Sequence, residues 1–145
     1  MKKRFKLPGC DEPASLDMDR ATRRLFIGCG NKKLTILDAD SGKVVATFPI
    51  GDHVDATIFD PAQKLAFTST GDGKITVVHE DSADKFTVID TITTQRGAKT
   101  MAYDAKNGRI FLPTVEGVPA TATGPPSAKR GMYKPGAFVV LVIEK

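Results

Sequence analysis

The chain has 145 residues, of which 41% are hydrophobic and 26% charged, and it carries a net charge of +4 at pH 7. This is the composition of a single globular domain with a core of its own. The chain contains no apolar run of the roughly 18 residues that a membrane span needs, so we predict no membrane partner. Four basic residues near the start precede no apolar segment, which indicates no signal peptide and predicts a cytoplasmic location.

The chain is predicted to form short strands throughout, because β-branched runs alternate with Asp, Ser and Gly turn signals. No long segment shows helical periodicity. We expect strands over 16–19, 25–29, 34–38 and 43–50, then over 56–60, 65–69, 75–80 and 86–93, and finally over 100–104, 110–113 and 137–143.

An internal repeat organises these strands. Asp19, Asp60 and Asp104 superpose at spacings of 41 and 44 residues. Two further sets are placed in register by the same comparison: Arg24-Leu25 with Lys64-Leu65 and Arg109-Ile110, and Leu34-Thr35-Ile36 with Ile75-Thr76-Val77. A period near 40 residues with four short strands is typical of a β-propeller blade. We therefore predict an all-β chain of three four-stranded antiparallel blades over residues 1–145.

Each repeated position has a physical explanation. The Asp begins a turn, where its carboxylate accepts hydrogen bonds from backbone amides. The basic residue before the second strand is predicted to lie at a solvated edge. Alternating apolar positions face the neighbouring blades, since packed sheets bury the side chains between them. A single blade cannot cover both of its faces, so an isolated repeat is not expected to fold.

Three segments resemble the YVTN-type propeller repeats of YncE-like bacterial proteins. They are "LTILDADSGKVVATFPIG", "FDPAQKLAFTSTGDGKITVV" and "TMAYDAKNGRIFLPT". The resemblance covers the chain from about residue 7 to residue 143 and is closest to the C-terminal part of such proteins. It implies a β-propeller fold, usually of seven blades, and an exported, often periplasmic, location. The chain is too short for such a ring and lacks an export signal.

The N-terminal residues 1–9 resemble a strand without a blade. Residues 4–9 match residues 46–51, which form an outer strand, whereas the third unit lacks its outer strand. The chain therefore holds twelve strands, enough for three blades, while closed propellers have about four to eight. We predict a homodimer in which two chains exchange this strand and close a six-bladed ring. The alternative is a truncated fragment of a longer YncE-like protein.

Residues 114–136 form a Pro- and Gly-rich insertion within the third unit, "TVEGVPATATGPPSAKRGMYKPG". This composition predicts a long loop between two strands of one blade. Two interpretations are open, a lid or partner-binding arm and a tolerated surface insertion.

The two cysteines, Cys10 and Cys29, are predicted to lie at the same end of the first blade. A disulfide between them is geometrically plausible and would stabilise the fold by about 3 kcal/mol. The alternative is that both thiols remain reduced in a cytoplasmic protein. His53 and His79 fall at different blade positions, so we predict no zinc site.

Polar residues gather in the loops that enter the inner strands and in the loops between second and third strands. These loops share one end of a propeller. They carry Asp11 and Glu12, together with the candidate ligand-binding residues His53, Asp55, Arg96, Lys99, Asp72 and Asn31. A mixed-charge rim of this kind suits a small polar ligand or a protein partner. The alternative is that these side chains only satisfy one another.

The leading functional hypothesis is a non-catalytic binding module without a cofactor. The alternative is a metal-dependent hydrolase similar to the lactonase propellers, with Asn31, Asp55 and Asp72 as candidate ligands. No nucleophile elbow, phosphate loop or dinucleotide fingerprint occurs. We expect no nucleic-acid partner, because the basic N-terminus is the segment predicted to be buried as a strand.

Overall fold

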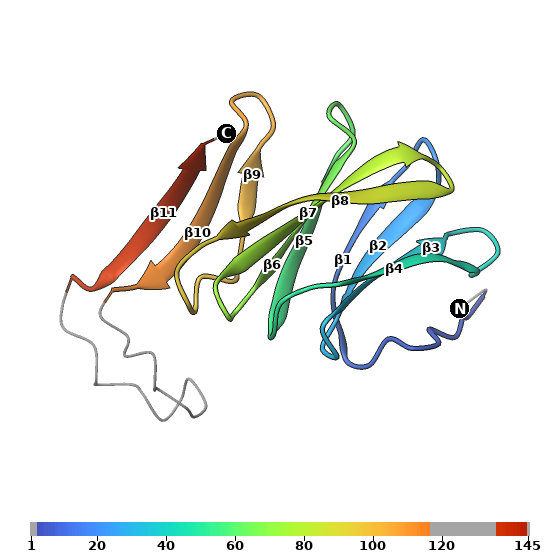
Figure 1. Ribbon diagram of the computed structural model, residues 1–145, viewed down its shortest axis with the longest axis horizontal. Helices are drawn as coiled ribbons and strands as arrows, with labels where there is room; N and C mark the ends of the chain where they lie inside the picture. Colours follow the sequence, from blue (N-terminus) through green and yellow to red (C-terminus); the bar gives the residue numbers. More distant parts are fainter. Residues whose placement is uncertain (1–2, 117–135, 145) are drawn as a thin grey trace.

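The computed structural model describes residues 3–116 and 136–144, which form eleven β-strands (Figure 1). The first sheet holds β1 (Pro13–Asp19), β2 (Arg24–Cys29), β3 (Lys33–Asp38) and β4 (Val44–Pro49). The second holds β5 (Val54–Asp60), β6 (Leu65–Thr70), β7 (Lys74–Ser82) and β8 (Lys85–Thr93). The third holds β9 (Ala102–Asp104), β10 (Arg109–Val115) and β11 (Phe138–Glu144).

All three sheets are antiparallel, and each runs in chain order from its first strand to its last. The predicted all-β architecture of propeller blades is therefore confirmed, with three strands in the third sheet where the first two have four. No helix that could cross a membrane occurs within residues 3–116 or 136–144.

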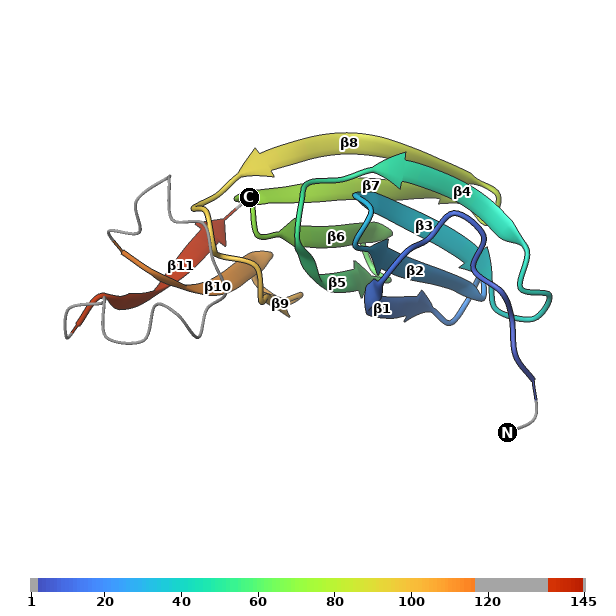
Figure 2. The ribbon, with the colours of Figure 1, turned by 90° about the horizontal axis from the view of Figure 1, so that it is seen from below.

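The sheets stand side by side (Figure 2), and apolar side chains are buried between them. One core cluster lies between the first and second sheets, where the rings of Phe26 and Phe59 stack with centroids 4.8 Å apart. A second cluster lies between the second and third sheets, where Phe67 and Tyr103 approach to 4.9 Å. The two aromatic pairs occupy the same places in successive repeats, as face-to-face packing of equivalent blades requires.

The repeat also appears in the backbone. Residues in the left-handed region of φ recur at the spacings of 41 and 44 that the aspartates indicated. The equivalent sets are Arg23, Lys64 and Gly108; Glu12, His53 and Gly97; and Lys32 and Gly73. Non-glycine residues seldom adopt positive φ, so its return at fixed positions shows that the turns of each unit have the same geometry.

The repeated aspartates cap the turns that follow β1, β5 and β9, as predicted. Asp19 accepts hydrogen bonds from the Ala21 and Thr22 amides, and Asp60 accepts them from the Ala62 and Gln63 amides. Asp104 accepts them from the Lys106 and Asn107 amides. Asp60 also accepts a hydrogen bond of 2.8 Å from the hydroxyl of Tyr103, which links the second blade to the third.

The structure corrects the register of the second repeat by one residue. Asp19, Asp60 and Asp104 pair across their hairpins with Arg24, Leu65 and Arg109, so Leu65 rather than Lys64 is the equivalent residue. The sequence comparison was wrong here because it matched the basic character of Lys64 instead of counting from the aspartate.

Arg24 also departs from the solvated edge that the sequence predicted. Arg24 is only 8% exposed. The guanidinium donates to Asp38 at 2.6 Å and to the backbone oxygen of Ala83 at 2.7 Å. Because Ala83 lies in the hairpin between β7 and β8, Arg24 fastens the first blade to the second.

The structure differs from the sequence prediction in the N-terminal segment and at the start of the predicted insertion. Residues 3–12 form no strand within this chain. Thr114 and Val115 continue β10 beyond its predicted end, since they pair with Val139 and Phe138. Most of the predicted insertion at 114–136 lies outside the described residues.

Candidate binding rim

Five loops meet at one end of the sheets, the lower edge in Figure 1, and we call this end the rim. The rim comprises residues 9–12, 30–32, 51–55, 71–74 and 94–100. Backbone hydrogen bonds join these loops in sequence, from Gly30 to Asp11, from Gly71 to His53 and from Gly97 to Gly71, each at 2.8–2.9 Å. Backbone groups thus join neighbouring loops of the rim, and some side chains, such as that of Asn31, add further hydrogen bonds between them.

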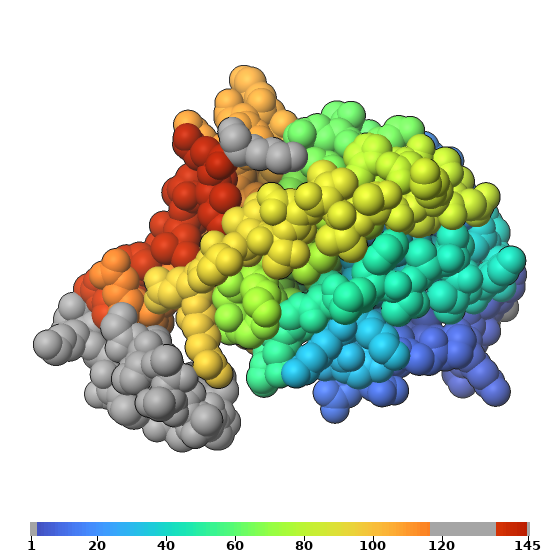
Figure 3. Space-filling model, viewed as in Figure 1, coloured from blue at the N-terminus to red at the C-terminus, as the bar shows by residue number. Residues whose placement is uncertain are grey.

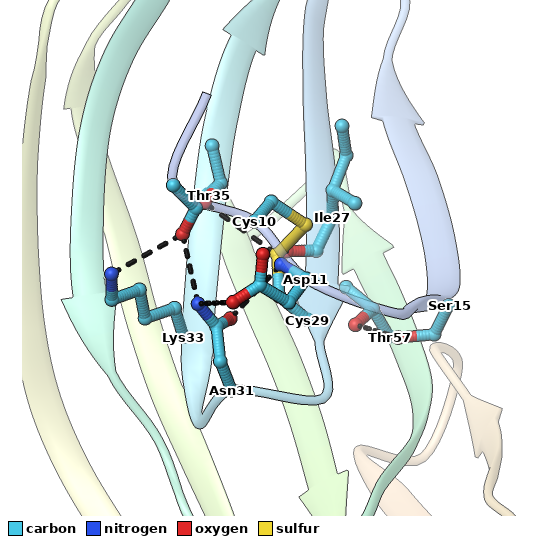
Figure 4. Close-up of a disulfide and its surroundings, with 10 residues drawn as sticks. Cys10, Asp11, Ser15, Ile27, Cys29, Asn31, Lys33, Thr35 and Thr57 are labelled. Carbon is cyan, nitrogen blue, oxygen red and sulfur yellow. Dashed lines mark hydrogen bonds between the residues drawn. A yellow bond between two sulfur atoms is a disulfide. The ribbon is translucent and has the colours of Figure 1, made fainter. Parts of the chain in front are cut away.

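The disulfide between Cys10 and Cys29 lies at the first-blade end of the rim (Figure 4). The two Cα atoms are 5.3 Å apart. Gly51 and Thr70 are the equivalent residues one repeat later, and a Cβ on Gly51 would lie 2.2 Å from the Thr70 hydroxyl. The entering loop thus approaches the end of the second strand closely in both repeats, which explains why cysteines at these positions reach bonding distance.

Asn31 belongs to the same end as the disulfide (Figure 4). Its amide nitrogen donates to the backbone oxygen of Gly9 at 3.0 Å and to the carboxylate of Asp11 at 3.2 Å. Its oxygen accepts from the Asp11 amide at 3.3 Å. Asn31 therefore holds the loop that enters β1, and its polar groups face that loop.

His53 projects from the loop between the first and second blades. Its φ of 60° turns the chain sharply, and its side chain is 74% exposed. The preceding residue, Asp52, forms an ion pair with Lys32 at 3.0 Å. The hydrogen bond from Lys32 holds the pKa of the Asp52 carboxyl below its usual value, so Asp52 is ionised at neutral pH.

Asp55 and Lys99 meet across the boundary between the second and third blades. Their ion pair measures 3.0 Å, and the Thr100 hydroxyl donates to the second Asp55 oxygen at 2.7 Å. Burial opposes ionisation of Asp55, but the hydrogen bonds from Thr100 and Lys99 outweigh it and lower its pKa.

The turn between β6 and β7 lies at the middle of this cluster. Gly71 is flanked by the side chains of His53 and Lys99, and Gly73 lies against the backbone amide of Arg96. Asp72 accepts a hydrogen bond of 2.6 Å from Thr70 and forms an ion pair with Lys74 at 3.2 Å. The structure thus brings His53, Asp72 and Lys99 together at one turn, with Asp55 paired to Lys99 and the backbone of Arg96 against Gly73. Asn31 lies at the neighbouring turn between β2 and β3.

Asn31, Asp55 and Asp72, the candidate ligands of a hydrolase metal, do not converge. Each has different partners: Asn31 bonds to Gly9 and Asp11, Asp55 to Lys99 and Thr100, and Asp72 to Thr70 and Lys74. Over residues 3–116 and 136–144, no group of three His, Cys, Asp or Glu side chains is placed to hold a metal ion. His79 lies outside the rim, where its ring contacts Asp81 at 2.7 Å.

The ion pair between Lys32 and Asp52 was not predicted from the sequence. A signal was present, because Asp52 follows Asp11 by 41 residues and both stand in the loop that enters an inner strand. An acidic residue repeated at that position indicates a shared place on the rim.

No protein-family model matches the chain, and no curated protein is significantly similar to it. Solved structures do match. Hydrazine synthase of Kuenenia stuttgartiensis superposes with a TM-score of 0.63 at 14% identity, over 80% of this chain and 33% of that one. A chain of the mitotic checkpoint complex gives 0.59 at 18% identity, over 68% and 32%.

The β-propeller domain of Cps50 (Swd1) from Myceliophteria thermophila gives a TM-score of 0.60 at 11% identity, over 72% of this chain and 35% of that one. The chain thus spans about a third of the length of these structures. At such low identities the likeness concerns the fold alone, and it supports the β-propeller architecture.

Proposed function

We propose that this chain is a non-catalytic propeller module of the YVTN or YncE-like kind, which uses the rim to bind a small polar ligand or the charged end of a peptide. The observation that supports the proposal is the cluster at the turn between β6 and β7, where the His53 and Lys99 side chains flank Gly71 and Asp55 pairs with Lys99. Loops held on a rigid sheet scaffold are where propeller-like folds and other scaffolds carry binding residues.

The equal numbers of acidic and basic residues on the rim favour a partner that carries both a positive and a negative charge. Its loops, with the adjoining Lys33, contain five acidic and five basic residues. They are Asp11, Glu12, Asp52, Asp55 and Asp72 on one side and Lys32, Lys33, Lys74, Arg96 and Lys99 on the other. A nucleic-acid surface would instead be predominantly basic. A free amino acid or a peptide end carries both charges within a short distance and matches this surface.

The chemistry of recognition follows from the cluster. Lys99 and Arg96 offer cationic donors to a carboxylate, while Asp55 and Asp52 offer carboxylates to an ammonium group. Both aspartates have lowered pKa values, so they keep their charge at neutral pH. Each rim ion pair is partly exposed and of small net stability, so an incoming charged group can replace one partner at little cost.

The test is a thermal-shift series on the whole chain with tripeptides that have free termini, compared with the same peptides blocked at both ends. A ligand at about 100 times its Kd stabilises a protein by about 2.7 kcal/mol, which raises the Tm of a domain of this size by about 5–10 °C. We expect the free peptides to produce this shift and the blocked peptides to produce none.

A matched pair of variants locates the site. Lys99→Ala with His53→Ala is expected to abolish the shift, whereas Lys64→Ala, an exposed lysine at the opposite end of the blades, leaves it intact. No shift with any free peptide, or equal loss in both variants, would refute the proposal.

A further inference from the structure

The outward face of the third sheet repeats an apolar pattern that is buried in the other two. The pairings Leu25 with Leu37, Ala66 with Val78 and Ile110 with Ile143 align the third strands of the three sheets. By this alignment, Val140 and Val142 take the places of Leu34 and Ile36 in the first sheet, and of Ile75 and Val77 in the second.

These equivalent residues differ in whether a neighbouring sheet packs on them. Leu34 and Ile36 have no exposed surface, because the second sheet packs on them. Val140 and Val142 are 58% and 51% exposed, and Phe138 beside them is 68% exposed. Figure 3 shows β11, in red, on the surface at one end of the row of sheets. A face built to the pattern of a blade interface is expected to receive another blade.

The edge of the third sheet is open as well. In the described residues β11 pairs with β10 alone, whereas the corresponding strands β3 and β7 each pair on both sides. An exposed edge strand with alternating apolar residues presents unpaired backbone groups to another strand. The third sheet can therefore accept a fourth strand at β11.

Residues 3–8 lie where the outer strand of a preceding blade would lie. Leu7 stands 41 residues before Phe48, which belongs to the outer strand β4. The backbone repeat of 41 residues therefore corrects by one residue the match of 4–9 with 46–51 made from the sequence. Phe48 packs on the core between its own sheet and the next, and Leu7 packs in the same way on the outer cluster of the first sheet, next to Ile27 and Leu37. The segment thus has the position of an outer strand and lacks only a strand to pair with.

We propose that a second copy of this chain supplies residues 3–8 as the fourth strand of the third sheet. The first blade fixes the register, because Phe48 pairs with Leu34 and Ala46 with Ile36. Leu7 of the second copy then lies opposite Val140, and its Phe5 lies opposite Val142. The first sheet of the second copy covers the outward face of the third sheet, and the reciprocal exchange closes a six-bladed ring with twofold symmetry.

Charge favours the same arrangement. In the proposed register, Lys3 of the second copy lies opposite Ile143, next to Glu144, whose side chain is 62% exposed and pairs with Arg109. Opposite charges on neighbouring strands stabilise pairing, and like charges would oppose it. The ring concerns assembly and is independent of what the rim binds.

The first experiment measures the mass of the whole chain by size-exclusion chromatography with light scattering over a hundredfold range of concentration. We expect a mass twice the 15.6 kDa of one chain. Val142→Lys is expected to give a monomer with an unchanged circular dichroism spectrum. Ile89→Lys is the matched control, because Ile89 is similarly exposed at 49% but lies on β8 away from the proposed contact, and it should remain dimeric.

A cross-link tests the register. Phe5→Cys combined with Val142→Cys is expected to yield a covalent dimer on a non-reducing gel, while Phe5→Cys combined with Phe138→Cys yields much less. A wild-type monomer at every concentration would overturn the proposal and leave the face for a further blade of a longer chain. Open-ended oligomers, or equal masses for the Val142→Lys and Ile89→Lys variants, would overturn it too.

Discussion

The two ends of the blades are both rich in aspartate but use it differently. At the turns that follow β1 and β5, Asp19 and Asp60 are buried and accept hydrogen bonds from backbone amides. At the rim, the Asp52 side chain is 39% exposed and faces Lys32. The same residue type is therefore structural where the backbone is its partner and available for binding where an exposed lysine is.

The cause lies in the loops themselves. The end opposite the rim, where Asp19 and Asp60 lie, is called the aspartate end. Its turns are short hairpin connections whose free amides need an acceptor, and the aspartate carboxylate supplies it. The rim combines loops that pass between sheets with the hairpin turns β2–β3 and β6–β7, and backbone hydrogen bonds join them, as from Gly71 to His53 and from Thr94 to Gly73. The Asp52 carboxylate there pairs with the exposed Lys32 side chain. The predictions below test this difference by removing groups from each end.

Removing the disulfide is expected to have the largest effect. Cys10→Ala with Cys29→Ala opens a covalent loop with a sequence separation of 19 residues, which costs about 3 kcal/mol through the entropy of the unfolded chain. The measurement is urea unfolding of the double variant and of the wild type, each with and without dithiothreitol. Reductant should lower the stability of the wild type alone. A loss below about 1 kcal/mol would show that the rim end is held by its backbone contacts instead.

Asp60→Ala tests how much the aspartate cap of the β5–β6 turn contributes, and it is expected to lower the free energy of unfolding by about 2 kcal/mol. Its removal leaves the Ala62 and Gln63 amides and the Tyr103 hydroxyl without an acceptor that is itself buried. Asp104→Ala is the control, because the same turn there is exposed, and it should cost about 1 kcal/mol or less. Equal losses in denaturant unfolding would mean that the link to Tyr103 contributes nothing.

Glu80→Gln tests how a buried carboxyl group near Asp19 affects stability. Glu80 is only 1% exposed, and neither carboxylate oxygen has a hydrogen-bond partner in the described residues. Burial, together with the nearby Asp19 carboxylate, raises the pKa of Glu80 above its usual value of 4.5. The folded state thus binds the proton more tightly than the unfolded state. The stability this contributes is fully present below pH 4.5 and is lost as the pH rises through the folded pKa.

The variant should therefore be more stable than the wild type at pH 8, by about 1 kcal/mol, and nearly equal to it at pH 4. Thermal unfolding at the two pH values measures the difference. A gain of the same size at both pH values would show that ionisation of Glu80 is not its cause.

Much of the fold could be predicted from the sequence, because repeated turns leave repeated residues. Asp19, Asp60 and Asp104 located the blades, and the strands followed from alternation between them. The burial of Arg24 was not predictable, since it depends on Ala83, which belongs to the second blade and comes near only after two blades pack. The grouping of His53 and Lys99 around Gly71 depends on blade order in the same way, whereas the loops that carry these residues could be identified from their place in the repeat.

Lys99→Ala is expected to have the smallest effect on stability. The ion pair with Asp55 is exposed on both sides, with side-chain exposures of 45% and 31%, and pairs of this kind contribute about 0.2–1 kcal/mol. Asp55 keeps its hydrogen bond from Thr100, so it is not left without a partner. We expect a loss below about 0.5 kcal/mol in urea unfolding, with a dependence on salt that Asp60→Ala does not share. A loss above about 2 kcal/mol would make Lys99 a structural residue, and the contrast between the rim and the opposite end would then fail at a residue that the proposed binding site uses.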